Sequence, residues 1–475
     1  MYSRSLLVLS QKNGCRGDSE STLYSLEEDM GTGKNRTHTA FVLVRFGLPL
    51  IFSGILQQLY SWADAFIVGR VEGETPLASI GATAAITEFF ILSITGFTLG
   101  LSILAAQMYG KDQSKEIRRI LSSFAILLGG IFVLLAVFGS ALAGPVLTLA
   151  NTPADMFHFS LDYLRIILMG IPFLAVYNTY SSVLRAMGDS KAPFYAVFIS
   201  SAMNVFLDIL FVVVLHKGVA GAAIATVISQ IAMTCFIILY SIRKHPVLRF
   251  SIQEKMLHWD IIKQGCKFGF PPAIQSSVTS LGNIILQNFM NGFGTHTVAA
   301  VTCAYRIDSI MLLPIVNLGS AISTMVAQSK GAGRQGLIKG YLGTGMAMMA
   351  VISLFLSAVM VLFGGRLVSI FGLDTEAIGI GHSFFRSIAV FYIFYGMATA
   401  FRGAVEGMGD VVYSSMAGIA ALCIRIMLSY LFAAPLANMA IPYAEGVCWI
   451  FMMLFFVPRI VVRGRELEIQ RLPHR

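Results

Sequence analysis

The chain has 475 residues, of which 56% are hydrophobic and only 12% are charged, and its mean hydropathy is +0.74. This composition lies far outside that of soluble globular domains and places the chain among integral membrane proteins. The net charge of +9 is divided among short connections between apolar stretches, so it reflects membrane topology and argues against nucleic-acid binding.

Apolar stretches of about 20 residues or more recur along the chain, and each is long enough to cross a bilayer as a helix. Short turns that carry Gly, Pro or charged residues separate them. The pattern predicts an all-α integral membrane protein with twelve transmembrane helices. They lie at about 38–69, 77–107, 118–145, 156–184, 192–215, 219–243, 260–292, 297–329, 337–364, 375–405, 411–434 and 440–462.

Lysines and arginines gather in every second connection, for example at Lys111, Arg243 and Lys330. Basic connections stay on the cytoplasmic side of a membrane, so both termini are predicted to be cytoplasmic. Residues 1–37 are polar and lack hydrophobic periodicity, and we expect a disordered cytoplasmic extension there. Residues 463–475 form a basic cytoplasmic tail.

The second half of the chain repeats motifs of the first half. FGLPLI, which contains Pro49, returns as FGFPPA, with Pro271 in the corresponding place. AAQMYG returns as VAQSKG, and LRAMGD returns as VEGMGD, so that Gly331 follows Gly110 at the same interval as Gly409 follows Gly188. The repeat predicts two six-helix lobes at 38–243 and 260–462, joined by a cytoplasmic linker at 244–259. Internal repeats of this kind are typical of secondary transporters, whose substrate site lies between the halves.

Asp64 lies inside the first apolar span. A charged side chain at the centre of a membrane helix costs about 2.5–3.5 kcal/mol on insertion scales, so such residues normally face a cavity or a partner. Tyr60 precedes Asp64 by one helical turn and shares its face. Pro49 removes a backbone hydrogen bond from the same helix and marks a place where it can bend. The alternative is that Asp64 caps a helix end or pairs with a basic neighbour.

Asn204 and Asp208 lie four residues apart in the fifth span, so their side chains point the same way. Thr226 lies in the sixth span and Tyr163 in the fourth. A structural interpretation is that Asn204 and Thr226 only link helices, at about 0.6 kcal/mol each.

A duplicated twelve-span chain that contains YSWADAFIVGR, AAQMYG, LRAMGD, MNVFLDILFV and GAAIATVISQ resembles the multidrug and toxic compound extrusion (MATE) family. The likeness covers about residues 42–462, and YRIDSIMLLP favours the DinF-like or MepA-like bacterial branch. The resemblance implies a V-shaped pair of lobes in the bacterial inner membrane. It also implies efflux of organic, typically cationic, molecules in exchange for H+ or Na+, without a cofactor.

The resemblance further implies which residues carry these roles. It assigns Pro49 to a helix that bends when the acid is protonated, and it predicts that Tyr60 and Tyr163 line the ion site. Other polar residues of the spans are expected to line the cavity, namely Glu88, Gln275 and Asp308. The cation-coupling cluster that the resemblance implies, which is also the possible Na+ site, consists of Asp64, Asn204, Asp208 and Thr226. Two carboxylates in one dry pocket repel each other when both are charged, so such a pocket accepts a proton or a hard cation.

The repeat does not copy the acids of this cluster. At the offset that relates Gly188 to Gly409, the counterparts of Asp64, Asn204 and Asp208 are Ile285, Arg425 and Ser429. We therefore expect buried acidity to be confined to the first lobe. An alternative for the second lobe is that Arg306, Asp308 and Arg425 form a structural pair or triad.

Two other functions compete with ion-coupled efflux. A lipid-linked oligosaccharide flippase of the same superfamily would need a basic cavity, whereas the polar groups predicted in the first lobe are acidic or neutral. A membrane receptor or enzyme would need a ligand or catalytic constellation, and the eight histidines and six cysteines are scattered without metal-binding spacing. We expect a monomer that binds small organic molecules and the bilayer, and neither catalysis nor a dedicated metal site.

Overall fold

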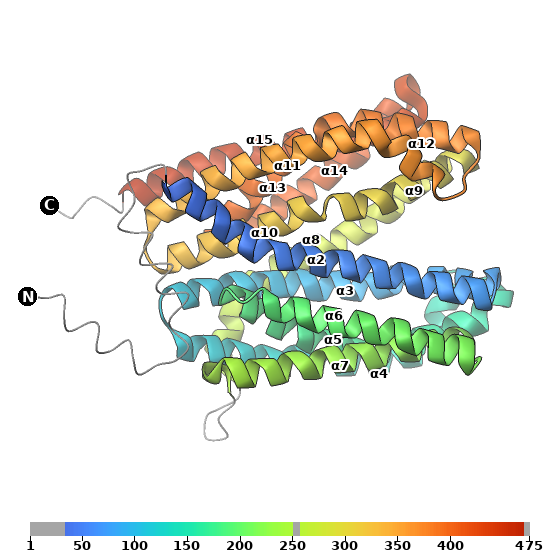
Figure 1. Cartoon of the computed structure of the whole chain (residues 1–475), viewed down its shortest axis with the longest axis horizontal. Coiled ribbons are helices and arrows are strands. Elements are labelled where there is room, and N and C mark those ends of the chain that lie inside the picture. Colours follow the sequence, from blue (N-terminus) through green and yellow to red (C-terminus); the bar gives the residue numbers. More distant parts are fainter. Residues whose placement is uncertain (1–33, 250–256, 470–475) are drawn as a thin grey trace, which may run out of the picture.

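The computed structural model describes residues 34–249 and 257–469, and Figure 1 shows the chain. Helices account for nearly all of this part of the chain, and no strand occurs in it. The helices of the first half are α2 (Lys34–Val71), α3 (Glu74–Gly110), α4 (Ser114–Leu149), α5 (Ala154–Ala186), α6 (Lys191–Asp208) with the π-helix η2 (Ile209–Val214), and α7 (Gly218–Lys244).

The second half follows a one-turn 3-10 helix, η3 (Pro246–Leu248). Its helices are α8 (Trp259–Asn291), α9 (Thr295–Met311), α10 (Leu313–Gly331), α11 (Gln335–Ser369), α12 (Thr375–Ile388), α13 (Tyr392–Gly407), α14 (Val411–Leu436) and α15 (Ala440–Ile469). The 3-10 turns η4 (Ala389–Phe391) and η5 (Ala437–Met439) join α12 to α13 and α14 to α15.

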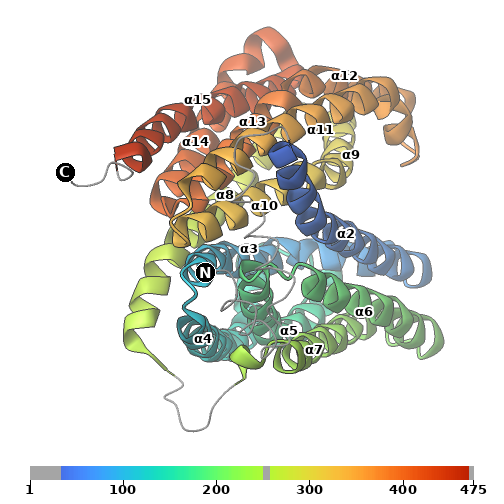
Figure 2. The same ribbon diagram turned by 60° about the vertical axis from the view of Figure 1, so that its left-hand side comes forward.

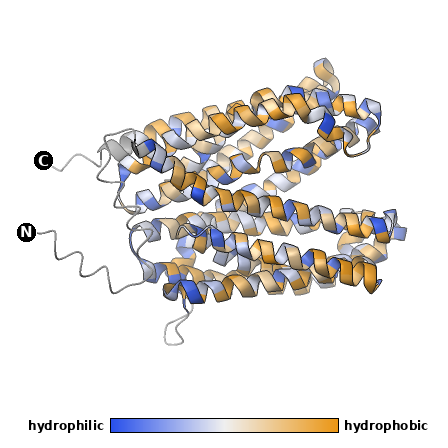
Figure 3. Ribbon diagram, in the orientation of Figure 1, coloured by the Kyte–Doolittle hydropathy of each residue, from blue (hydrophilic) through white to orange (hydrophobic). Residues whose placement is uncertain are grey.

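Within the described residues, these elements form twelve spans, six in each half, as the sequence predicts. Two spans are broken. α9 and α10 meet at a bend of 42°, where Pro314 opens α10 and Leu312 lies between the two helices. α12 continues into α13 through η4. Figure 3 shows apolar residues over the middle of the bundle and hydrophilic residues gathered toward the ends of the helices, as a bilayer requires.

The ends of the spans differ slightly from the prediction. α2 begins at Lys34, inside the predicted extension, and the rest of that extension, residues 1–33, lies outside the described residues. α15 continues to Ile469, inside the predicted basic tail. Arginine, leucine and glutamate favour helices, so a span can continue past the apolar residues that cross the bilayer. Of the predicted linker, residues 250–256 also lie outside the described part.

Each half of the chain contributes a helix that reaches into the core of the other half. Near its start, α2 buries Leu43, Phe46 and Leu50 in a hydrophobic core built from the second half. Near its end, α2 buries Val68 beside Tyr163 in the first half. Figure 2 shows α2 passing from one lobe to the other. This helix therefore connects the two lobes physically.

α8 makes the reverse crossing. Its first half packs against α3 and α4, where a Cβ on Gly265 would lie 2.2 Å from the ring of Phe124. A Cβ on Gly100 of α3 would lie 2.0 Å from the backbone oxygen of Phe268, so the backbones of α3 and α8 touch and only glycine fits there. Its last turns bury Phe289 in the core of the second half. The two crossing helices, α2 and α8, are equivalent in the internal repeat.

A partly buried aspartate, Asp189, links the connection between α5 and α6 to the end of α7. The Oδ2 atom of Asp189 accepts hydrogen bonds from the Tyr240 hydroxyl and from Nε2 of His245, each at 3.0 Å, and Nζ of Lys244 lies 3.7 Å away. Burial raises the pKa of Asp189, but the bond to His245 and the charge of Lys244 outweigh burial, so this pKa lies below its usual range. The repeat equivalent, Asp410, is held the same way by arginines of α15.

Asp189→Asn is expected to lower the free energy of unfolding by about 1–3 kcal/mol at neutral pH, because it removes hydrogen bonds to a charged acceptor. A lowered folded-state pKa stabilises the fold fully above the unfolded pKa of about 3.9, and this stabilisation is lost as the pH falls through the folded pKa. Thermal unfolding in detergent should therefore show a difference between wild type and variant that shrinks below about pH 4. Asp260→Asn, at an exposed position, is the matched control.

Candidate functional site

The four residues of the predicted cation-coupling cluster come from three helices of the first half. α2 carries Asp64, α6 carries Asn204 and Asp208, and α7 carries Thr226. Asn204 is 1% exposed and Asp208 is completely buried. The amide nitrogen of Asn204 donates a hydrogen bond to Oγ1 of Thr226 at 3.4 Å. Because Asn204 and Asp208 lie one turn apart, both side chains leave α6 on the same face, as the spacing predicts.

The acids of this cluster lack the partners that buried charges normally have. Asp64 and Asp208 are close enough to interact electrostatically. In the part of the chain that the structure describes, both carboxylate oxygens of Asp208 are buried without a hydrogen-bond partner, and so are Oδ1 of Asp64 and Oδ1 of Asn204. Four buried acceptor oxygens thus lie unpaired around one region. A bound proton or a hard cation would satisfy them, because buried charge is tolerated only when it is compensated.

Two tyrosines lie beside the acids. The Tyr163 side chain from α5 is 9% exposed and lies within electrostatic range of Asp64, Asp208 and Tyr60. Tyr60, one turn before Asp64 on α2, interacts in the same way with Asp64 and with Tyr177 of α5. The structure therefore brings six of the first-half residues singled out from the sequence, the four of the cluster and the two tyrosines, into one region between α2, α5, α6 and α7.

Asp208 is the last α-helical residue before a π-helical segment. The segment η2 spans Ile209–Val214, and its end is marked by a bond from the Leu215 amide to the Leu210 carbonyl at 2.9 Å, five residues back. π-helical turns are rare and occur frequently at functional sites. The sequence does not predict this turn, because the run ILFVVV has no feature that separates an α-helical from a π-helical span.

Pro49 lies on α2 next to Leu50, the last α2 residue in the second-half core, and before the residues that reach the acids. Proline cannot donate the backbone hydrogen bond that would close the preceding turn, so this point of α2 is the easiest to bend. A bend at Pro49 would move Asp64 relative to Asp208 while Leu43 and Phe46 stay packed. The role of Pro49 as a hinge remains a prediction.

The three other predicted cavity residues do not join this cluster in any contact that the structure records. Glu88 is exposed on α3. Gln275 on α8 is buried, and its Oε1 accepts a hydrogen bond from Nη2 of Arg402 at 3.1 Å. Asp308 on α9 is also buried and accepts a hydrogen bond from the hydroxyl of Tyr392. Gln275 and Asp308 thus take part in polar networks of the second half.

The first of these networks contains an ion pair that was not predicted from the sequence, Arg425 with Glu445. Nη2 of Arg425 on α14 donates to Oε2 of Glu445 on α15 and to the hydroxyl of Tyr305 on α9, both at 2.9 Å. Glu445 and Asp308 lie within electrostatic range of each other. Glu445 is a charged residue inside the last apolar span. Its position alone would have identified it as a candidate functional residue. Of the expected pair or triad, Asp308 lies within electrostatic range of Arg425, whereas Arg306 is exposed and no recorded contact joins it to either residue.

The second network joins α8, α13 and α14. Nε of Arg402 donates to Oε1 of Glu406 at 2.7 Å, one turn further along α13, and the hydroxyl of Ser414 donates to the same oxygen at 2.7 Å. The expectation that buried acids occur only in the first half is therefore wrong, because Asp308 and Glu406 are buried in the second half and the side chain of Glu445 is only 12% exposed. The two halves differ in another way: these acids have bonded partners, whereas Asp208 has none among the described residues.

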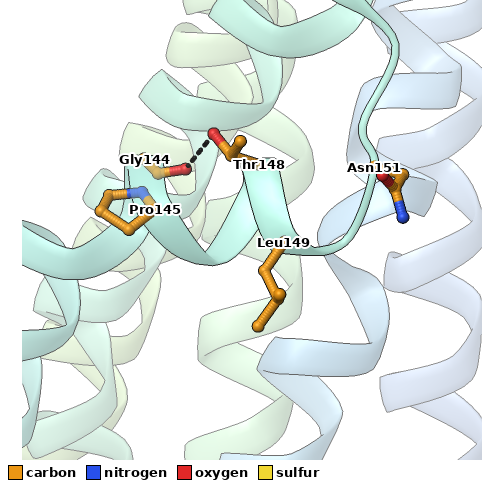
Figure 4. Close-up of a pocket in the computed structure, with 5 residues that line it drawn as sticks. All are labelled: Gly144, Pro145, Thr148, Leu149 and Asn151. Carbon is orange, nitrogen blue, oxygen red and sulfur yellow. Dashed lines mark hydrogen bonds between the residues drawn. The ribbon is translucent and has the colours of Figure 1, made fainter.

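A hollow on the surface lies at the end of α4 and contains none of the candidate residues. Figure 4 shows its lining, in which Oγ1 of Thr148 donates a hydrogen bond to the carbonyl of Gly144 at 3.0 Å. No charged side chain lines this hollow, so it supplies no charge to attract an ion. Its lining consists of Gly144, Pro145, Thr148, Leu149 and Asn151.

Comparison with known proteins identifies the family. The family model described as MatE matches residues 49–210 and again residues 271–431, one copy in each half of the chain. The chain belongs to the MATE family. The two matches coincide with the two halves related by the internal repeat. They confirm the resemblance seen in the sequence, while the placement within the DinF-like or MepA-like branch remains a prediction.

Relatives and solved structures agree with a MATE fold. The "Probable multidrug resistance protein YpnP" of Bacillus subtilis (strain 168) is 29% identical over 86% of this chain and 92% of its own. The "Probable multidrug resistance protein YoeA" of the same strain is 30% identical over 79% of this chain and 83% of its own. A solved outward-facing conformation of a multidrug resistance MATE family transporter covers 91% of this chain and 97% of its own, with a TM-score of 0.85 and 20% identity.

Proposed function

We propose that this MATE protein is a secondary efflux transporter that exchanges organic, preferentially cationic, molecules for H+ or Na+ by alternating access. The single observation that supports this function best is the set of buried acceptor oxygens on Asp64, Asn204 and Asp208 without a hydrogen-bond partner among the described residues. Left uncompensated, such a site is destabilising, so the protein gains free energy by taking up a small positive ion there.

The geometry also suggests how ion uptake is linked to opening. Asp64 is on α2, which packs on the second half near Leu43 and on the first half near Val68. Binding a proton or cation between Asp64 and Asp208 reduces their mutual repulsion and favours a different angle of α2, with the bend at Pro49. Exchange requires that ion and substrate bind at each other's expense, a coupling of about 1–3 kcal/mol.

The names of both Bacillus relatives favour an organic substrate over a lipid-linked oligosaccharide. The partly buried arginines in the spans of the second half also argue against a lipid-linked oligosaccharide. Arg402 and Arg425 already bond to Glu406 and Glu445, so neither is a free cation for a pyrophosphate group. We place the transporter in the bacterial inner membrane with both termini in the cytoplasm, because the basic connections lie at that end of the helices.

The purified full chain in proteoliposomes tests this function. With a fluorescent organic cation inside, an imposed pH or Na+ gradient, applied one at a time, is expected to drive dye release well above the rate of protein-free liposomes. The gradient that drives release identifies the coupling ion. Equal release with and without each gradient, for every dye in a panel of cationic drugs and dyes, would rule out ion-coupled efflux.

A further inference from the structure

Two hydrogen bonds join the lobes, and they involve equivalent positions of the internal repeat. Nε2 of Gln107 at the end of α3 donates to the carbonyl of Gly407 at the end of α13, at 3.1 Å. Nε2 of Gln328 at the end of α10 donates to the carbonyl of Ala186 at the end of α5, at 2.8 Å. The two donors occupy equivalent positions of the repeat, and so do the two acceptors. Each lobe thus supplies one donor and one acceptor.

Each acceptor is a helix-end carbonyl that its own helix leaves open. The last carbonyls of an α-helix have no intrahelical donor, and the turn that follows usually satisfies only some of them. After α5, the amides of Met187, Gly188 and Asp189 donate hydrogen bonds to the carbonyls of residues 183–185. The carbonyl of Ala186 accepts its hydrogen bond from Gln328 instead. After α13, the amides of residues 408–410 donate to the carbonyls of residues 404–406, and the carbonyl of Gly407 accepts from Gln107. The glutamines therefore cap helices of the opposite lobe.

The backbones of α3 and α10 also touch beside these bonds. A Cβ on Gly110 would lie 2.0 Å from the backbone oxygen of Gln328, and a Cβ on Gly331 would lie 2.1 Å from the backbone oxygen of Gln107. No side chain fits at such distances, so both positions require glycine while the lobes are together. Both glycines end the repeated motifs AAQMYG and VAQSKG. The motif thus provides a capping glutamine and a contact glycine three residues apart.

These contacts lie at one end of the molecule only. Figure 1 shows the ends of α3 and α10 side by side near the start of α2 and the end of α15, while the helices of the two halves diverge toward the opposite end. We propose that Gln107, Gln328, Gly110 and Gly331 form the inner gate of the transporter, held shut in this structure. This inference rests on the proposed alternating-access function: the gate must separate for the cavity to open toward the cytoplasm.

A distance measurement tests the gate without any transport assay. Spin labels attached through Gln113→Cys and Ala332→Cys, two exposed positions just beyond α3 and α10, report the separation of the lobes once the native cysteines are replaced. The double variant Gln107→Ala/Gln328→Ala is expected to raise the ratio of long to short distances roughly 5- to 100-fold, because it removes two hydrogen bonds from the closed state only. Each single variant should give about half of that shift on a logarithmic scale.

Matched controls separate the gate from general destabilisation. Gln287→Ala removes a bond from an exposed glutamine to Asn291 on the same helix and should leave the distances unchanged. Gly110→Ala forces a methyl group into the contact and should also populate the long distance, whereas Gly340→Ala, which meets nothing within 4 Å, should not. The inference is overturned if neither the double glutamine variant nor Gly110→Ala lengthens the distance in folded, monodisperse protein.

Failure of the gate and failure of the proposed function give different results. If wild-type proteoliposomes export no dye but the variants still lengthen the label distance, the gate stands and the transport proposal fails. If wild type exports dye under a gradient while both glutamine and glycine variants keep the short distance, the transport proposal stands and the gate is wrong. If both hold, the double glutamine variant should also change the rate of gradient-driven export.

Discussion

Asp208→Asn is expected to abolish export driven by an ion gradient. Asparagine has nearly the same shape as aspartate, but it neither takes up a proton at physiological pH nor provides a negative charge for Na+. Asp208 is fully buried, and neither of its oxygens has a partner within the described chain, so the substitution breaks no recorded bond. In proteoliposomes, release of the organic cation should fall to the rate of protein-free vesicles under either gradient.

A second readout separates lost coupling from lost binding. If the proposed exchange is coupled to H+, protonation and substrate binding oppose each other in wild type, so the Kd of the dye should change with pH by roughly 5- to 150-fold. In Asp208→Asn, the dye should still bind, with a Kd that depends much less on pH. Asp155→Asn, an exposed substitution in the first turn of α5, should keep both wild-type behaviours. Full gradient-driven export by Asp208→Asn would show that Asp208 does not couple transport to the ion.

The spans and the internal repeat could be predicted from the sequence because both depend on local signals. Membrane spans need long apolar runs, and the repeated motifs return at a nearly constant offset in the chain. The same holds for Asn204 and Asp208, since a spacing of four residues fixes their relative direction on any helix. The bend between α9 and α10 also has a local cause in Pro314, although the sequence analysis did not single it out.

Contacts between helices could not be predicted in this way. That Asp64 of α2 lies near Asp208 of α6 was expected only through the family resemblance, because nothing local in the sequence pairs these two spans. Glu445 was overlooked, and its bond to Arg425 depends on how α14 packs against α15. The crossing of α2 into the second half also depends on packing, since its apolar residues fit either core equally well by hydropathy.

Arg425→Met is expected to destabilise the protein by about 3–5 kcal/mol, which is typical when one partner of a buried ion pair is removed. The side chains of Arg425 and Glu445 are only 19% and 12% exposed, and Asp308 lies nearby, so the variant leaves two acids close together without a cation. Methionine retains most of the volume of the arginine stem, which limits the effect of a cavity. Denaturant or thermal unfolding in detergent measures the loss, and Arg366→Met, at an exposed position, is the control.

The double variant Arg425→Met/Glu445→Gln identifies the cause of that loss. If the unpaired charge of Glu445 destabilises Arg425→Met, neutralising it should recover a large part of the stability, as is found when both members of a buried pair are replaced. Wild-type stability of Arg425→Met would contradict a structural role for this pair.

The same unfolding measurement on Asp208→Asn should give the opposite sign. Removing a buried charge that has no bonded partner among the described residues stabilises the fold or leaves its stability unchanged. Removing Arg425, in contrast, leaves the carboxylate of Glu445 without its cation. The acids of the second half would then be structural. The acids of the first half would be retained at some expense in stability, which is expected of a site that must bind and release an ion in every cycle.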